Sequence, residues 1–412
     1  MNVVFISPQF PDTYWNWCDR LRACGATVLG IGDTPYDSLA SEVRTALDEY
    51  YWVPSLEDYD QVFRAVAFFS WKYGKIDWLE SQNEYWLMQD ARLRDDFHIT
   101  TGAGVAQMAQ WQSKAEMKPL YAAAGVPTAR QVRLTSMRSV FAFARKVGYP
   151  LFAKPERGMG AGGTFKVPDE ASLESLFERD LGEPYVLEEF VTGDICSYEA
   201  ILDEQGEPLF ENQSEYPVDI ASTVEELLDV WYYTCPTVDP QLARLARATA
   251  KAFGITSRFV HMEFFRLTAD KPGLGNAGDY VGLEVNVRAP GGYDPDMINF
   301  AHSFDLYQIW ADMVVSGTST HAADGETFYC VYASQRDCHA YAHTHQQIME
   351  RYGQAVCMQG RMPDVLSDDL GNTFYMVRVK TLDEGKRFAA YVHQWAGEAE
   401  APDAAEETAQ NE

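Results

Sequence analysis

Two short segments of alternating polar and apolar residues constrain this fold more than any other feature of the chain. In residues 281–288 (VGLEVNVR), Glu284, Asn286 and Arg288 alternate with apolar residues, and Glu263 sits in the same pattern within FVHMEFF. Because successive side chains of a strand point to opposite faces, each segment is predicted to be a strand with one polar and one buried face. The Gly-rich loop between them would place Glu263 beside Glu284.

The residue types on this polar face favour a metal site. Neighbouring carboxylates favour a cation between them, and oxygen donors beside a fixed guanidinium suit Mg²⁺ held against a polyphosphate. Glu263, Glu284 and Asn286 are therefore the candidate metal ligands, and Arg288 is the candidate catalytic residue. A half-buried hairpin whose polar face is merely solvated is the alternative.

A Gly-rich loop lies between two further predicted strands, residues 151–153 and 164–167. Glycines let backbone N–H groups approach phosphate oxygens, and Lys154 at the end of the first strand adds a positive charge. The loop does not open a helix after the first strand of the chain, as a dinucleotide fold requires, and the Walker string is absent. The candidate phosphate-binding glycines of this loop are Gly158, Gly160 and Gly162.

Two other segments complete the pattern. In residues 185–191 (YVLEEFV), an apolar run leads into an acidic pair and then an apolar pair. The main chain of this segment can hold the edge of a purine. A helix-like segment carrying Lys114 is expected to stop at Gly125 and Pro127. A strand ending in a charged turn and a solvated lysine are the respective alternatives. The hinge candidates are Glu188, Glu189, Phe190 and Val191.

These motifs, in this order, resemble the ATP-grasp superfamily over roughly residues 100–315. The resemblance implies that Lys114 and Lys154 contact phosphates, that the hinge holds adenine, and that Arg288 stabilises the transferring phosphoryl group. Many members bind ribose with a glutamate after the hinge glycine; this chain has Asp194 there, and ribose binding is assigned to it.

The resemblance is to the carboxylate–amine ligase type, similar to biotin carboxylase and D-alanine–D-alanine ligase. It implies an ADP-forming ligase that joins a small carboxylate to an amine through an acyl phosphate. ATP and Mg²⁺ are the implied cofactors, with two ions expected and Mn²⁺ as a substitute. The alternatives are a biotin-carboxylase-like enzyme that activates bicarbonate and a catalytically inactive ATP-binding regulatory protein.

Composition narrows the class of protein. A formal net charge of −28 over 412 residues argues against a nucleic-acid partner, since phosphate backbones require clustered lysine and arginine. No apolar run is long enough for a membrane span, and the seven cysteines lack paired spacing, which favours a cytoplasmic protein. The sequence leaves open whether the chain forms a homodimer.

The predicted fold class is multidomain, with α/β and α+β parts. A strand, helix and strand at the start predict an open α/β domain that precedes the ATP-grasp domain. A small β-α-β-β-α unit and a disordered acidic tail are expected at the end. The predicted boundaries are 1–97, 98–318, 319–395 and 396–412.

Three minor patterns could indicate a functional site, but each also has a purely structural explanation. Gly30-Ile31-Gly32 invites a dinucleotide interpretation, but a third glycine is missing. Asn83 and Glu84 follow a predicted strand and either touch a ligand at the sheet edge or cap the next helix, which we favour. The three histidines 339, 343 and 345 lack a metalloprotease motif, so a structural role is favoured over a metal site, although 339 and 343 could share a helical face.

Overall fold

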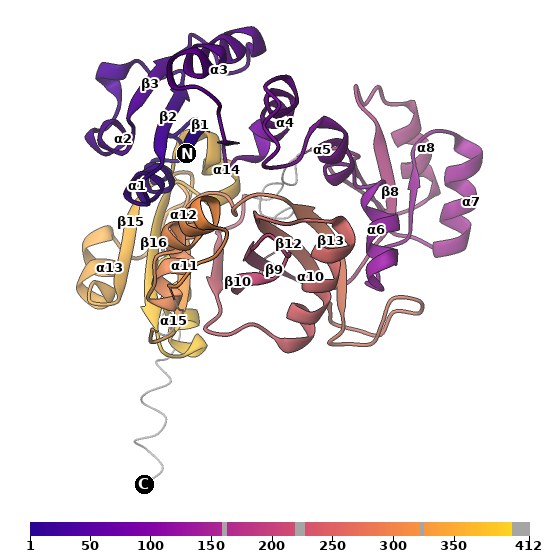
Figure 1. The fold of residues 1–412 in the computed structure, drawn as a ribbon. Coiled ribbons are helices and arrows are strands. Elements are labelled where there is room, and N and C mark those ends of the chain that lie inside the picture. The colour runs from indigo at the N-terminus through magenta and orange to yellow at the C-terminus, as the bar shows by residue number, and fades with distance from the viewer. Residues whose placement is uncertain (159–162, 219–226, 322–324, 398–412) are drawn as a thin grey trace. The chain divides into compact units, whose positions relative to one another are not determined.

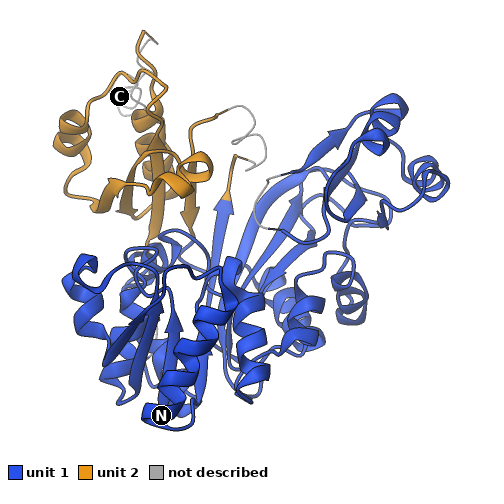
Figure 2. Ribbon diagram, turned by 90° about the horizontal axis from the view of Figure 1, so that it is seen from above, with its two compact units in different colours: residues 1–215, 235–327 blue, residues 216–234, 328–412 orange. Residues whose placement is uncertain are grey.

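The computed structural model describes all residues except 159–162, 219–226, 322–324 and 398–412. The chain divides into two compact units, one formed by residues 1–215 and 235–327 and the other by residues 216–234 and 328–412 (Figure 2). The predicted acidic tail falls almost wholly outside the described residues. The predicted domain boundaries remain predictions.

The first unit begins with an open α/β layer (Figure 1). Its parallel sheet has the order β3-β2-β1-β4. Apolar side chains alternate along β1, so that one face packs on α1 and α12 and the other on α3. The elements are β1 (Asn2–Ile6), α1 (Trp15–Ala23), β2 (Thr27–Gly32), α2 (Ser41–Ala46), β3 (Glu49–Trp52), α3 (Tyr59–Tyr73), β4 (Trp78–Glu80), the 3₁₀ helix η2 (Glu84–Trp86) and α4 (Leu87–Asp96).

The glycines of β2 serve packing. A Cβ on Gly30 would lie 2.6 Å from the side chain of Leu47, and one on Gly32 would lie 2.5 Å from the hydroxyl of Tyr50. Both distances are shorter than real Cβ contacts, so any larger residue would require these side chains to shift. This packing accounts for the G-x-G pattern without a dinucleotide.

A small antiparallel sheet with the order β5-β8-β6-β7 follows, covered by α7 and α8. Two short helices precede it, and the second ends before Gly125, whose left-handed φ of 68° makes it the expected stop. The elements are α5 (Val105–Trp111), α6 (Met117–Ala124), β5 (Gln131–Arg133), α7 (Met137–Val147), β6 (Leu151–Pro155), β7 (Phe165–Val167), α8 (Glu170–Glu178) and β8 (Tyr185–Glu189).

The larger sheet of the first unit carries the strands that were predicted from alternation. Its strand order is β13-β12-β9-β10, and α6 and α10 pack on one face. The opposite face is apolar at one end, where it meets α1, α11 and α12, and polar further along. The elements are β9 (Gly193–Leu202), β10 (Pro208–Tyr216), α10 (Pro240–Phe253), β12 (Arg258–Leu267), β13 (Tyr280–Asn286), α11 (Asp294–His302) and α12 (Leu306–Ser316).

The second unit has antiparallel strands in the order β11-β14-β16-β15, with α13 and α15 packed on them. The predicted β-α-β-β-α series is present, but the structure adds α14 before β16 and draws β11 from an earlier part of the chain. The elements are β11 (Trp231–Thr234), β14 (Tyr329–Gln335), α13 (His345–Tyr352), β15 (Val356–Arg361), α14 (Asp364–Leu370), β16 (Thr373–Val379) and α15 (Leu382–His393).

The three histidines of this unit do not share a helical face, since α13 begins only at His345. His339 contacts Asp229, His343 bonds the side chain of Gln394, and His345 bonds the hydroxyl of Tyr375. Across the described residues, no group of three or more His, Cys, Asp or Glu side chains is arranged to hold a metal. None of the described helices is long and apolar enough to cross a membrane.

A buried charge cluster joins β4 and α4 to the start of β12. Arg258 lies 2.9 Å from Glu80, Arg94 lies 3.5 Å from the same carboxylate, and Ser81 donates to Asp90 at 2.6 Å. Burial, reinforced by Glu80, raises the pKa of Asp90 to about 7 despite the nearby Arg94. The carboxyl therefore keeps its proton in the folded protein over a range where the unfolded chain has lost it.

We predict that Asp90→Asn removes part of the pH dependence of stability. Because the folded-state pKa is raised, this group makes the free energy of unfolding fall as pH rises from about 4 to 7, by up to about 1.4 kcal/mol per pH unit. Asparagine keeps an oxygen for Ser81 but does not titrate. Urea unfolding of both proteins across this range measures the difference, and identical slopes would contradict the prediction.

Candidate active site

The β12–β13 hairpin places two carboxylates side by side. Its antiparallel register pairs Glu263 with Glu284 and His261 with Asn286. The side chains of the two glutamates keep only 25% and 19% of their surface exposed. The juxtaposition expected from strand alternation is therefore confirmed, and it puts like charges next to each other in a largely buried place.

Each carboxylate of this pair has its own cationic neighbour. Lys114 lies 3.0 Å from Glu284, and His261 bridges Glu263 at 3.4 Å and Glu199 at 2.9 Å. Burial disfavours a charged imidazole, but hydrogen bonds to Glu199 and Glu263 outweigh it and raise the pKa of His261 to about 9. The imidazolium is therefore fixed between two acids.

The two carboxyls titrate differently. Burial and the neighbouring Glu263 raise the pKa of Glu284, although Lys114 opposes the shift. Burial also acts on Glu263, but His261, then Arg288 and Lys114, outweigh it and lower its pKa. Burial and the neighbouring carboxylate both disfavour the charged form of Glu284, and a cation beside the pair would oppose both effects.

This donor set fits a magnesium ion that is completed by a ligand. Mg²⁺ in proteins usually takes one or two carboxylates and fills its remaining positions with phosphate oxygens and water. Glu263 and Glu284 supply two carboxylates, and the amide of Asn286 adds a third oxygen donor on the same pair of strands. The predicted set of ligands is thus chemically consistent, and it remains a prediction.

Lys114 lies outside the helix in which the sequence placed it. The segment forms two helices, α5 and α6, and Lys114 sits in the turn between them. Its backbone N–H donates to the carbonyl of Glu156 at 2.9 Å, and its ammonium donates to the carbonyl of Gly158 at 3.2 Å. Lys114 therefore links the start of the Gly-rich loop to the carboxylate pair.

The predicted lysine on β6 shares a buried carboxylate with a lysine that the sequence did not reveal. Glu188 lies 2.7 Å from Lys154 and 2.6 Å from Lys118, and it also accepts from Gln131. Burial opposes ionisation, but the two lysines outweigh it and lower the pKa of Glu188 to about 2. The recurrence of lysine four residues after Lys114 is the only sequence signal for Lys118.

The acidic pair of the hinge splits between two sides of β8. Glu189 points away from Lys154 and bonds Arg130 at 2.5 Å, with Lys271 at 3.8 Å. Lys271 also donates to the carbonyl of Phe190, so the β12–β13 loop reaches the hinge backbone. Val191 is buried in a small cluster with Leu267 of β12 and Val281 of β13.

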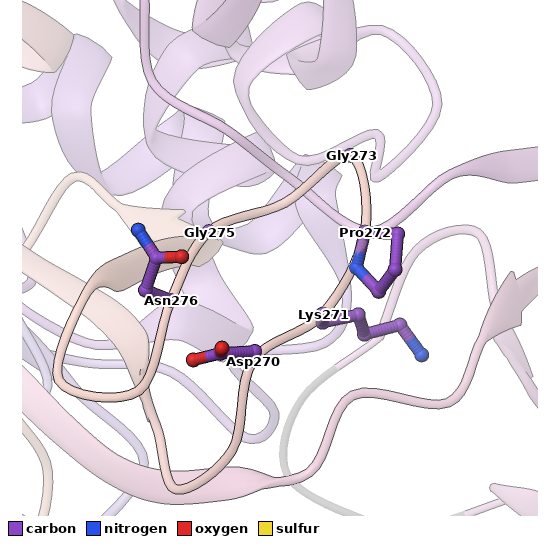
Figure 3. Close-up of a pocket in the computed structure, with 6 residues that line it drawn as sticks. All are labelled: Asp270, Lys271, Pro272, Gly273, Gly275 and Asn276. Atoms are coloured by element: carbon purple, nitrogen blue, oxygen red, sulfur yellow. The ribbon is translucent and has the colours of Figure 1, made fainter.

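A pocket of about 290 Å³ lies in the same β12–β13 loop (Figure 3). The side chain of Lys271 extends away from Asp270 and Asn276 in this view. The lining residues are Asp270, Lys271, Pro272, Gly273, Gly275 and Asn276. The pocket therefore belongs to the loop, and none of the predicted site residues lines it.

Asp194 is not brought together with the carboxylate pair. It lies opposite Arg266 on β12, with which it forms an ion pair at 3.4 Å. Strand alternation puts Asp194 on the face that carries Cys196 and Tyr198, whereas Ser197 pairs with Glu263. Ribose binding by Asp194 remains a prediction.

Of the predicted phosphate-binding glycines, only Gly158 is described, and its φ is 149°. Gly160 and Gly162 lie outside the described residues. The loop is bounded by the antiparallel strands β6 and β7, as predicted.

Arg288 follows β13 and is held by residues from the N-terminal layer. Its Nε donates to Glu84 at 3.0 Å, and its Nη1 donates to the carbonyl of Ala289 at 2.7 Å. The N–H of Ala289 in turn donates to Gln82 at 2.8 Å. The capping role foreseen for the segment falls to Asn83, which accepts from the N–H of Tyr85, whereas Glu84 binds the candidate catalytic arginine.

Comparison with known proteins gives distant relatives. No family model matches the chain. It is 24% identical to an L-arginine-specific L-amino acid ligase of Bacillus subtilis over 269 residues, which cover 63% of this chain and 63% of the relative. It is 21% identical to an alanine–anticapsin ligase of Bacillus subtilis strain 168 over 330 residues, 71% of this chain and 66% of the relative. The matches thus span less than two thirds of either relative.

Solved structures match almost the whole chain. An L-amino acid ligase from Bacillus licheniformis superposes with a TM-score of 0.71 at 14% identity, covering 95% of this chain and 96% of that one. The biotin carboxylase domain of a 2-oxoglutarate carboxylase from Hydrogenobacter thermophilus, solved with MgADP, ADP and bicarbonate, gives 0.64 at 16% identity, covering 96% and 90%. The chain therefore has the ATP-grasp fold, as its motifs predicted.

Proposed function

We propose that the protein is an ATP-dependent, ADP-forming ligase that joins the carboxylate of one amino acid to the amine of a second substrate. The observation that carries this proposal is the pair of carboxylates on β12 and β13 with Lys114, from the turn between α5 and α6, beside it. The printed names of both relatives, an L-amino acid ligase and an alanine ligase, favour amino acids as the substrate class.

The charges of the site suit a nucleoside triphosphate. Lys154 and Lys114 are held by carboxylates at 2.7 and 3.0 Å, so both ammonium groups are oriented before a phosphate arrives. Glu263, Glu284 and Asn286 would hold Mg²⁺, which neutralises charge on the phosphates when it is bound. The hinge backbone would bind adenine, and Lys271, which donates to the carbonyl of Phe190, lies beside it.

The proposed chemistry has two steps. A carboxylate oxygen attacks the γ-phosphorus of ATP, ADP leaves, and an acyl phosphate remains. The amine then attacks the acyl carbon and phosphate leaves, with the carboxylate oxygen retained in that phosphate. Arg288 would stabilise the transferring group, and a well-placed donor of this kind contributes about 3 kcal/mol. The Gly-rich loop would exclude water from the acyl phosphate.

The experiment is a screen for ADP release with single L-amino acids and with pairs of them. We expect release to require a carboxylate and an amine together, and ¹⁸O placed in the carboxylate should appear in phosphate. Release of AMP and pyrophosphate would overturn the mechanism. Release that depends on bicarbonate would favour a biotin-carboxylase-like enzyme, and no release would favour a non-catalytic ATP-binding protein.

The proposed function also bears on the cellular location and the oligomeric state of the protein. Dependence on ATP favours the cytoplasm. A homodimer is a further proposal, supported by the dimer described for the biotin carboxylase domain from Hydrogenobacter thermophilus, and light scattering of the purified chain tests it.

We predict that Lys154→Ala weakens ATP binding by about 1.5 to 3 kcal/mol, the range of a hydrogen bond to a charged group. Calorimetric titration with ATP and Mg²⁺ measures the change. Lys72→Ala is the matched control. Lys72 lies on α3, where it forms an ion pair with Glu49 of β3, and its loss should leave ATP affinity unchanged. Wild-type affinity in Lys154→Ala would remove this lysine from the site.

We predict that Glu284→Gln lowers the rate of ADP release by about 100-fold or more at saturating Mg²⁺, because the charge that balances the ion is lost. The amide keeps the shape of the side chain and an oxygen for Lys114. The variant loses the ion pair with Lys114 but also the repulsion from Glu263, so the two effects oppose each other and the unfolding midpoint should change little. Glu116→Gln serves as control, since Glu116 pairs with Arg133 and is 48% exposed. Near wild-type turnover by Glu284→Gln would refute the ligand assignment.

A further inference from the structure

Glu84 is a charged side chain in an unusual place. It comes from the 3₁₀ helix after β4, 204 residues before Arg288, and yet only 12% of its side chain is exposed. Both of its carboxylate oxygens are engaged: Oε2 accepts from Arg288 Nε at 3.0 Å, and Oε1 accepts from Gln112 Nε2 at 3.0 Å. A largely buried carboxylate bound in this way holds one orientation.

Two of the three nitrogens of the Arg288 guanidinium are bound by residues that the structure describes. Nε is bound to Glu84 and Nη1 to the carbonyl of Ala289. Within the described part of the chain, Nη2 has no hydrogen-bond acceptor. Because the guanidinium is planar and rigid, fixing Nε and Nη1 also fixes the direction of Nη2.

The segment around Glu84 is itself anchored to the bend after β13. Gln82 adopts a left-handed φ of 53°, which is uncommon for a residue other than glycine. Its side-chain oxygen accepts from Ala289 N–H, and its carbonyl accepts from the hydroxyl of Tyr14 at 3.1 Å. The strained backbone is thus held by contacts on both sides, as expected where a loop must present a side chain in one position.

Arg288 comes from the same segment of the chain as one member of the carboxylate pair. It lies two residues beyond Asn286, the last residue of β13, and this strand also carries Glu284. The contact with Glu84 therefore orients a guanidinium that directly follows the candidate metal strand.

We propose that Glu84 is a positioning residue, which holds Arg288 by Nε so that Nη2 is the donor offered to the transferring phosphoryl and acyl groups. This inference rests on the proposed ligase function. Glu84 would act through Arg288 alone and would not contact the nucleotide.

A double-mutant cycle tests the inference. Glu84→Ala, Arg288→Lys and the double variant are compared with the wild type by their kcat for ADP release and their Kd for ATP. Glu84→Ala should lower kcat by about 10- to 100-fold, as expected for loss of a charge-assisted bond, with ATP affinity within about twofold. In the Arg288→Lys background, the same change should cost less than about threefold, because lysine has no Nε to be held.

Two more variants test whether the loss of rate comes from the contact between Glu84 and Arg288. Glu84→Gln keeps an oxygen for Arg288 Nε and should recover part of the lost rate, which also covers the case in which Glu84→Ala fails to fold. Glu57→Gln is the matched control, because Glu57 binds the hydroxyl of the adjacent Tyr85 at 2.9 Å and does not touch Arg288. Its kcat should equal that of the wild type.

The outcomes separate the two proposals. Equal losses from the Glu84 change in both arginine backgrounds, or a parallel loss of ATP affinity, would overturn the positioning role while the ligase proposal stands. A wild-type protein that releases no ADP with any substrate pair would overturn the ligase proposal and this inference with it.

Discussion

Two largely buried carboxylates on neighbouring strands must be kept together despite their repulsion, and much of the described site depends on this constraint. Glu263 and Glu284 face each other because of the register of β12 and β13. His261 and Lys114 supply one positive charge to each. Removing one partner from a buried ion pair is strongly destabilising. The pair therefore depends on the turn that carries Lys114. It also depends on the strand that carries Glu199, because Glu199 holds His261.

The parts of the site that sequence predicted are those that local periodicity determines. Alternation at steps of two identifies the polar face of β13 and the pairing of Glu263 with Glu284, and it depends only on strand geometry. The stop of α6 before Gly125 follows from the conformational freedom of glycine in the same way. These features require no knowledge of the rest of the chain.

The parts that sequence missed are contacts between distant segments. Nothing near Glu84 marks it as the partner of Arg288, and Lys118 resembles any other helical lysine until the fold brings Glu188 against it. The assignment of ribose binding to Asp194 is of a different kind, because it followed from the position of this residue directly after the hinge glycine and not from strand alternation, and it remains a prediction. Asp194 shares its face with Cys196, whereas the residue opposite Glu263 is Ser197.

The network of paired charges also indicates how a strongly acidic protein can accept a polyphosphate. Lys154 is held by Glu188 and Lys114 by Glu284, so a nucleotide entering alone would compete with these carboxylates and add negative charge beside the Glu263–Glu284 pair. Bound between Glu263 and Glu284, a divalent cation would reduce that conflict, because it would offset the repulsion from Glu263 that, after burial, helps to raise the pKa of Glu284. Under the proposed function, the site would therefore suit the metal–nucleotide complex, and its lysines would orient phosphates whose charge the cation has already reduced.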